Sequence, residues 1–121
     1  MAQTLSKEER LSGKTAVGGL LKKGRWGFTA NLKYCWLYPG SGECSRIMVS
    51  VPKRSFKRAV KRNLLKRRLR ESYRTQKDLL GTPGPVDLMF FYNSREVLDS
   101  AVIRSEVEEV LRTLTEKLSV Q

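Results

Sequence analysis

Histidine is absent from this 121-residue chain. Because histidine is the side chain best suited to proton transfer near neutral pH and the commonest transition-metal ligand, its absence argues against a Ser-His hydrolase and against a metalloenzyme. The two cysteines, Cys35 and Cys44, are too few for a disulfide scaffold, and we expect both to be thiols. No apolar run reaches the roughly 18 residues of a membrane span, and the first ten residues do not resemble a signal peptide. We therefore expect a cytoplasmic protein of one domain, 1–121, with residues 1–11 extended or poorly ordered.

Acidic residues are also scarce, with 12 Asp and Glu against 24 Lys and Arg, which gives a net charge of +12. The excess is concentrated in residues 53–74, where eleven basic side chains face a single acid, Glu71. A small domain this basic indicates an acidic polymer as partner, either nucleic acid or an anionic membrane. Asp87 is the only carboxylate in an apolar segment, whereas a metal-dependent nuclease needs a cluster of acids.

Hydrophobic periodicity and turn residues predict an α+β fold in which helices pack on a single mixed or antiparallel sheet. Residues 86–92 are almost continuously apolar, which is typical of a central strand. The expected helices are 13–23 (with Ser12 as N-cap and Gly24 as its end), 59–74, and a last one that begins at Asp99 or Ser100; the expected strands are 28–38, 46–51 and 86–92, with a turn at 39–43.

The helix expected at 59–74 has two chemically distinct faces. At 100° per residue, six polar side chains share less than half of the circumference: Arg62, Asn63, Lys66, Arg67, Arg70 and Arg74. Leu65, Leu69 and Tyr73 form the adjoining apolar stripe. Like charges four residues apart destabilise a helix, so this unrelieved clustering favours phosphate binding over a merely solvated face. A membrane surface is less favoured, because the helix lies between two strands and its own sheet takes the apolar stripe.

The run Lys61-Arg-Asn-Leu-Leu-Lys-Arg-Arg-Leu-Arg-Glu71 resembles the signature of the protein component of bacterial ribonuclease P. Val49-Ser-Val-Pro-Lys-Arg54 resembles the family strand that precedes it, while Arg10-Leu11 and Leu20-Leu-Lys-Lys-Gly24 fit the family's opening helix. The resemblance extends from about residue 5 to 118. It implies the element order α-β-β-β-α-β-α, similar to the second domain of ribosomal protein S5, with a left-handed crossover carried by residues 52–60, an exception to the usual hand.

The resemblance also implies a non-catalytic subunit of an endoribonuclease, in which a catalytic RNA cuts precursor tRNA at its 5′ end with magnesium bound mainly by RNA. We expect no cofactor or metal on the protein itself, no membrane partner, and a monomer in a one-to-one complex with the RNA. The expected RNA-binding residues are Lys53, Arg54, Lys61, Arg62, Asn63, Lys66, Arg67, Arg70 and Arg74. The expected cleft for the single-stranded 5′ leader, between the sheet and the first helix, contains Val17, Leu21, Tyr34, Cys35 and Ser50.

Several positions leave alternatives open. Leu64 stands where the family often repeats Arg, and Val17 and Leu21 align with family aromatics that face the leader. The cleft tyrosine of the family aligns near Tyr34 or Cys35, and Asn63 either donates to RNA or braces the loop at 52–60. Exposed aromatics of the first strands, among them Trp26 and Phe28, would stack on unpaired bases, although strand aromatics are more often core. The alternative function is that of a ribosomal or other structural RNA-binding protein without a role in tRNA processing.

Overall fold

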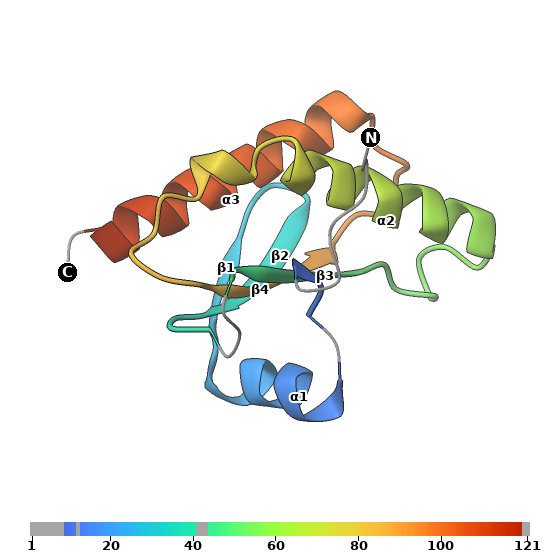
Figure 1. Cartoon of the computed structure of the whole chain (residues 1–121). Coiled ribbons are helices and arrows are strands. Elements are labelled where there is room, and N and C mark those ends of the chain that lie inside the picture. The colour runs from blue at the N-terminus through green and yellow to red at the C-terminus, as the bar shows by residue number, and fades with distance from the viewer. Residues whose placement is uncertain (1–8, 12, 41–43, 120–121) are drawn as a thin grey trace.

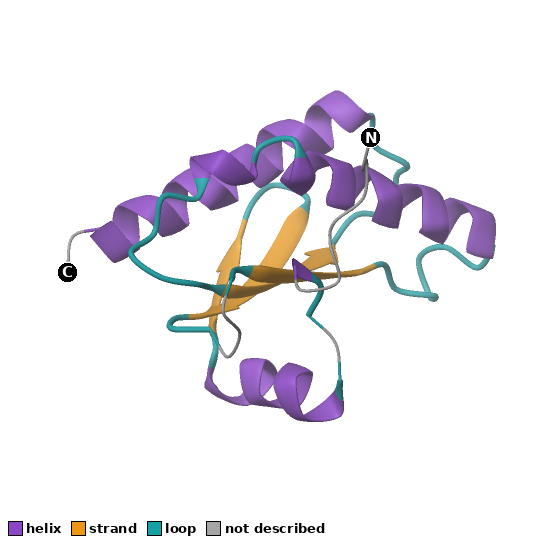
Figure 2. Ribbon diagram, in the orientation of Figure 1, coloured by secondary structure: helices purple, strands orange, loops and turns teal. Residues whose placement is uncertain are grey.

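The computed structural model describes residues 9–11, 13–40 and 44–119, and places one four-stranded sheet between two layers of helix (Figures 1 and 2). One helix, α1, lies alone on one face of the sheet, and α2 and α3 lie together on the other face. The elements in chain order are α1 (Lys14–Lys23), β1 (Arg25–Phe28), β2 (Leu32–Leu37), β3 (Arg46–Ser50), α2 (Ala59–Arg74), a 3₁₀ turn (Lys77–Leu79), β4 (Asp87–Tyr92) and α3 (Ser100–Ser119). The α+β class and the order α-β-β-β-α-β-α are confirmed.

The strands lie in the order β1-β2-β4-β3, with β1–β2 and β2–β4 antiparallel and β3–β4 parallel. The apolar strand β4 is therefore central, as its composition predicts. A parallel pair needs a crossover connection, and here it runs from β3 through residues 51–58 and α2 before β4. The hand of this crossover and the likeness to ribosomal protein S5 stay predictions.

The larger hydrophobic core lies between the sheet and the pair α2–α3. Leu65 and Leu69 of α2 are fully buried and Tyr73 is 2% exposed, which confirms the apolar stripe of this helix. From α3, the side chains of Val107 and Leu111 enter the same core. Since the apolar side of α2 packs against its own sheet, its polar side faces solvent or a partner.

A smaller core lies under α1, where Leu20 covers Cys35 and Met89 together with Leu11. The Cys35 thiol is fully buried and donates a hydrogen bond from Sγ to the Leu20 carbonyl oxygen at 3.5 Å. Burial raises the pKa of Cys35, and the nearby charge of Lys33 opposes this only in part. Cys35 and Cys44 are both thiols rather than a disulfide, as expected, although Cys44 is only half-buried.

The first hairpin differs from the sequence prediction. The strand expected at 28–38 is in fact the end of β1, a turn at 29–31 and β2. No Gly or Pro marks this turn; instead, the Glu106 carboxylate of α3 accepts hydrogen bonds from the Asn31 backbone N–H and side-chain amide, each at 2.7 Å, and from the Thr29 hydroxyl. The turn is thus fixed by a side chain 75 residues away, which periodicity does not reveal.

Helix ends and terminal segments follow the predictions in part. Helix α1 ends before Gly24 as expected, but its N-cap is Gly13, with a positive φ of 92°, and Ser12 lies outside the described residues. The Asp99 carbonyl accepts the Ile103 N–H at 3.1 Å, which makes Asp99 the cap of α3. Of the turn at 39–43 only the first two residues are described, and of residues 1–11 only 9–11. Leu11 donates its backbone N–H to the Ile47 carbonyl at 2.8 Å, so the chain there runs extended along β3.

Candidate nucleic-acid interface

The outward side of α2 carries a shallow basic groove, which we call the α2 surface. It brings together four of the side chains predicted from the helical wheel, and adds Arg10 from the segment along β3. The predicted members are Asn63, Arg67, Arg70 and Arg74. Because these side chains recur every three or four residues, they lie on the same side of the helix. Val60 and Leu64 add apolar side chains to the lining of the groove. The arrangement suits a polyanion whose charges are spaced along the helix.

Arg62 does not belong to the α2 surface, although the helical wheel placed it with the others. Its Nη1 donates to the carbonyl oxygens of Phe56 at 2.7 Å and of Lys57 at 2.8 Å. The half-buried guanidinium therefore braces the crossover loop, because these two carbonyls have no partner in the helix that follows. Among the described residues no hydrogen bond joins the Asn63 side chain to that loop, and Asn63 is exposed. The bracing role left open for Asn63 thus falls to Arg62.

The remaining predicted cations lie around this surface rather than in it. Lys53 and Arg54 are exposed in the crossover loop, Lys61 is exposed in the first turn of α2, and Lys66 is half-buried. Arg54 lines a separate hollow with Lys33 and Arg95.

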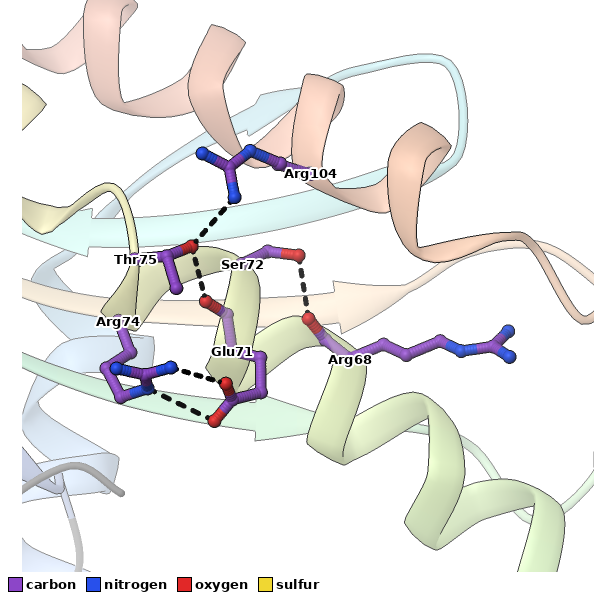
Figure 3. A network of polar contacts seen from close by, with 6 residues as sticks. All are labelled: Arg68, Glu71, Ser72, Arg74, Thr75 and Arg104. Carbon is purple, nitrogen blue, oxygen red and sulfur yellow. Dashed lines mark hydrogen bonds and ion pairs between the residues drawn. The ribbon is translucent and has the colours of Figure 1, made fainter. Parts of the chain in front are cut away.

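Two acids that the sequence sets among basic or apolar residues are each paired with an arginine. Arg74 donates two hydrogen bonds to the Glu71 carboxylate, from Nη2 to Oε2 at 2.7 Å and from Nε to Oε1 at 3.1 Å (Figure 3). The bond to Arg74, aided by the charge of Arg67, lowers the pKa of the Glu71 carboxyl. Asp87, the carboxylate that the sequence singles out, is buried and pairs with Arg46, with Nε and Oδ1 3.3 Å apart. Its role is structural.

The predicted leader cleft is rearranged by the strand register. Tyr34 pairs with Gly27 and its ring lies against that glycine, on the α2–α3 side of the sheet and therefore away from α1. Burial, with a smaller contribution from the charge of Glu109 on α3, raises the pKa of Tyr34. Tyr34 is thus wrongly assigned to the cleft. Cys35 does face α1, but it is covered by Leu20 and is inaccessible to a ligand.

Of the other three cleft residues, two belong to α1 and the third ends β3. Val17 is half-buried against the sheet, Leu21 is 41% exposed, and Ser50 is half-buried at the end of β3. The side chains of α1 therefore fill the space over the middle of the sheet.

Next to the smaller core, one row of the sheet carries two aromatic rings and a cation. The strand register places Phe28, Lys33, Phe91 and Ser50 next to one another across the four strands. Phe28 is 64% exposed, and the ring of Trp26, itself 42% exposed, lies 5.5 Å from that of Phe91. We call this row, together with the adjoining Trp26 of the next register position on the same face, the aromatic row; its members are Trp26, Phe28, Lys33 and Phe91. Trp26 and Phe28 were candidates for stacking in the sequence, whereas Phe91 was not, and β1, which presents the first two, was not recognised as a separate strand.

The chemistry of the aromatic row suits an unpaired nucleotide. Lys33 Nζ lies 4.6 Å from the centre of the Trp26 ring and 5.9 Å from that of Phe28, so charge and π-faces are presented together. Exposed rings stack on bases without regard to sequence, and adjacent cations attract the phosphates. Lys33 and Phe91 also line the hollow that Arg54 and Arg95 line, so the row adjoins a basic hollow beside the crossover loop.

In the described part of the chain, no three His, Cys, Asp or Glu side chains are grouped so that they could hold a metal ion. No helix in that part is both long and apolar enough to cross a membrane.

Similarity to known proteins covers most of the chain. The family model described as Ribonuclease P matches residues 5–115. A ribonuclease P protein component from Porphyromonas gingivalis is 37% identical over 78 residues, which span 63% of this chain and 57% of that protein. The solved ribonuclease P proteins of Staphylococcus aureus and Thermotoga maritima match with TM-scores of 0.75 and 0.74, each at 21% identity, over 88% and 87% of this chain and 95% and 96% of theirs. The two structures establish the fold.

Proposed function

This chain belongs to the ribonuclease P protein family, and we propose that it is the protein subunit of a ribonucleoprotein that matures the 5′ end of tRNA. In this role it binds the catalytic RNA as a monomer in a one-to-one complex, and the RNA, with magnesium, cleaves the precursor. The observation that carries the proposal is the α2 surface, where Arg67, Arg70 and Arg74 are aligned and the neighbouring acid Glu71 is neutralised. Such a surface binds phosphates and offers no group for proton transfer at neutral pH.

The 5′ leader is the second proposed ligand, and the aromatic row is its platform. A leader is single-stranded, so its bases are free to stack on Phe28 and Trp26 while its phosphates follow Lys33 and Arg54. The row takes the place of the Val17 and Leu21 positions, which carry no aromatic ring here. The α2 surface and the row thus divide the work between structured RNA and unpaired RNA.

Cleavage of a 5′-extended precursor tRNA at low magnesium tests the proposal. A bacterial ribonuclease P RNA is assayed with the wild-type protein, without it, and with the double variant Arg67→Ala/Arg70→Ala. The protein is expected to stimulate cleavage strongly and to cleave nothing alone, and the double variant is expected to lose most of the stimulation. Arg112→Ala/Lys117→Ala is the matched control, because it removes the same charge from exposed positions of α3.

The outcomes separate the alternatives. Equal loss in both double variants would mean that only total charge matters, and that the α2 surface is not a docking site. No stimulation by the wild type, together with tight binding to another structured RNA, would favour a ribosomal or other structural RNA-binding protein. Cleavage by the protein alone would contradict the assignment of the chemistry to RNA.

A further inference from the structure

A second basic groove lies between α2 and the first turns of α3, next to the α2 surface. Arg67 and Arg68 line it from α2 and Arg104 lines it from α3, and Leu64 forms part of its floor. Figure 3 shows Arg104 reaching from α3 over Thr75, at the end of α2. The groove has a volume of about 450 Å³, which leaves room for a hydrated anion, since one water takes about 30 Å³ in the liquid.

Within the part of the chain that the structure describes, few N–H donors of the three guanidinium groups are engaged. Arg104 uses Nη1 for the Thr75 hydroxyl at 3.2 Å, and Arg68 uses Nη1 for the Leu98 carbonyl at 2.5 Å. Each arginine has five N–H donors, so these single bonds orient the guanidinium and leave a fork for an anion. Glu71 is the acid in the lining, so three arginines against one carboxylate give the groove a net charge of +2, and Glu71 is also paired with Arg74.

The hydrogen-bond partners of these arginines show that the groove is not simply a salt-bridge network. Thr75 and Leu98 supply neutral oxygens, and among the described residues no carboxylate pairs with Arg68 or Arg104. Elsewhere on α3 the exposed arginine Arg112 does have an acidic partner, with Nε 2.8 Å from the Glu108 carboxylate. Arg68 and Arg104 therefore keep their charges available for an arriving anion.

We propose that this groove binds phosphates of an RNA backbone, so that the RNA that docks on the α2 surface is held along both edges of α2. The inference rests on the proposed function and adds Arg68 and Arg104 to the contact residues. Leu64, Arg67 and Glu71 line both the groove and the α2 surface, so the two are continuous and one phosphodiester chain can cross from one to the other. Arg104 lies 30 residues beyond the basic run of α2, which is why the sequence motif does not include it.

The salt dependence of RNA binding tests the groove. The dissociation constant for a bacterial ribonuclease P RNA is measured between 50 and 200 mM KCl for the wild type, Arg104→Ala and Arg112→Ala. Losing one phosphate contact lowers the magnitude of the slope of log K against log salt by roughly 0.7–0.9. Between 50 and 200 mM, the variant should therefore lose about threefold less affinity than the wild type does. Arg104→Ala is expected to show this change. Arg112→Ala removes the same charge from an exposed position two turns along the same helix, and is expected to keep the wild-type slope.

The result distinguishes the inference from the proposed function. If the wild type binds the RNA with a steep slope and Arg104→Ala matches it, the groove is not a phosphate site while the subunit role stands. If Arg104→Ala and Arg112→Ala lower the salt slope equally, the effect is a long-range effect of charge, and the groove is again excluded as a phosphate site. If the wild type does not bind the RNA, both proposals fail. Thermal unfolding of each variant guards against loss of the fold, and Arg104→Lys should recover part of the slope because it keeps the charge.

Discussion

Arg62 and Phe56 are joined by a hydrogen bond from the guanidinium Nη1 to the carbonyl oxygen, 2.7 Å long, that ties the start of α2 to the loop that precedes it. The Phe56 ring packs edge-on against Tyr92 of the central strand, with centroids 5.6 Å apart. The first turn of the basic helix is therefore anchored to the core through its own arginine. The arginines of one short motif have different tasks, since Arg62 faces the fold and Arg67 faces the solvent.

Arg62→Ala is expected to lower the free energy of unfolding by about 1–3 kcal/mol, because it removes a charged donor from two loop carbonyls. Arg67→Ala removes an equal charge from an exposed position of the same helix and should change stability by less than about 0.5 kcal/mol. Urea unfolding of the two variants makes the comparison. Matching midpoints would show that Arg62 does not brace the loop.

Leu69→Ala should cost about 2–5 kcal/mol, since Leu69 is fully buried between α2 and the sheet. Leu64→Ala is the matched control, because Leu64 lies in the same helix but is only half-buried at the groove. The difference between the two, read from chemical denaturation, measures which side of α2 is inside. Equal losses would contradict the facing of the helix.

The sequence was sufficient for the parts of the fold where one face is apolar and the other is not. Leu65, Leu69 and Tyr73 recur at helical spacing beside a continuous set of cations, so only one orientation of α2 buries its apolar stripe. Strand β2 carries no such information, because Tyr34 and Cys35 are both buried, on opposite faces of a sheet covered on both sides. A strand apolar on both faces does not reveal which face meets which helix.

Long-range contacts account for the rest of what sequence reasoning missed. The turn that separates β1 from β2 depends on Glu106, and the bracing of the crossover depends on where Arg62 turns its side chain. The aromatic row exists only because three strands align Phe28, Lys33 and Phe91 in one register. Local spacing holds none of these relations, whereas the resemblance to a family supplied the missing strand in the predicted order.

Glu106→Ala is expected to destabilise the protein by about 1–3 kcal/mol, because the Asn31 amide groups and the Thr29 hydroxyl lose their common acceptor in a part-buried site. Glu108→Ala, two residues along the same helix, breaks only the exposed pair with Arg112 and should cost about 0.3–0.5 kcal/mol. Calorimetric unfolding separates the two. A loss for Glu108→Ala as large as that for Glu106→Ala would contradict the special role of Glu106 in the hairpin.

The Glu71 carboxyl should titrate below the usual value for glutamate of about 4.3, because Arg74 stabilises its charged form. A folded-state pKa below the unfolded one means that the contribution to stability is complete above the unfolded value and is lost as pH falls through the folded one. Solvent screening keeps this contribution small. A carboxyl-carbon NMR titration should give a low midpoint in the wild type and a higher one in Arg74→Ala; an unchanged midpoint would mean that the ion pair does not persist in solution.

Phe28 provides the sharpest test of the aromatic row, because it is the most exposed of the rings and its loss should leave the core intact. Base–aromatic stacking is worth about 1–3 kcal/mol per base. Phe28→Leu should therefore weaken binding of leader-bearing precursor tRNA to the assembled ribonucleoprotein by roughly five-fold or more. Phe28→Tyr keeps the π-face and should bind as the wild type does.

Mature tRNA, which has no leader, is the second control for the same three proteins. It should bind equally well to all of them, since the stacking partner is missing and the α2 surface is untouched. If Phe28→Leu weakened both RNAs alike, the ring would act on the fold or on the catalytic RNA rather than on the leader. If it weakened neither, unpaired bases would have to find their platform elsewhere, and the exposed rings of β1 would be surface without a role in stacking.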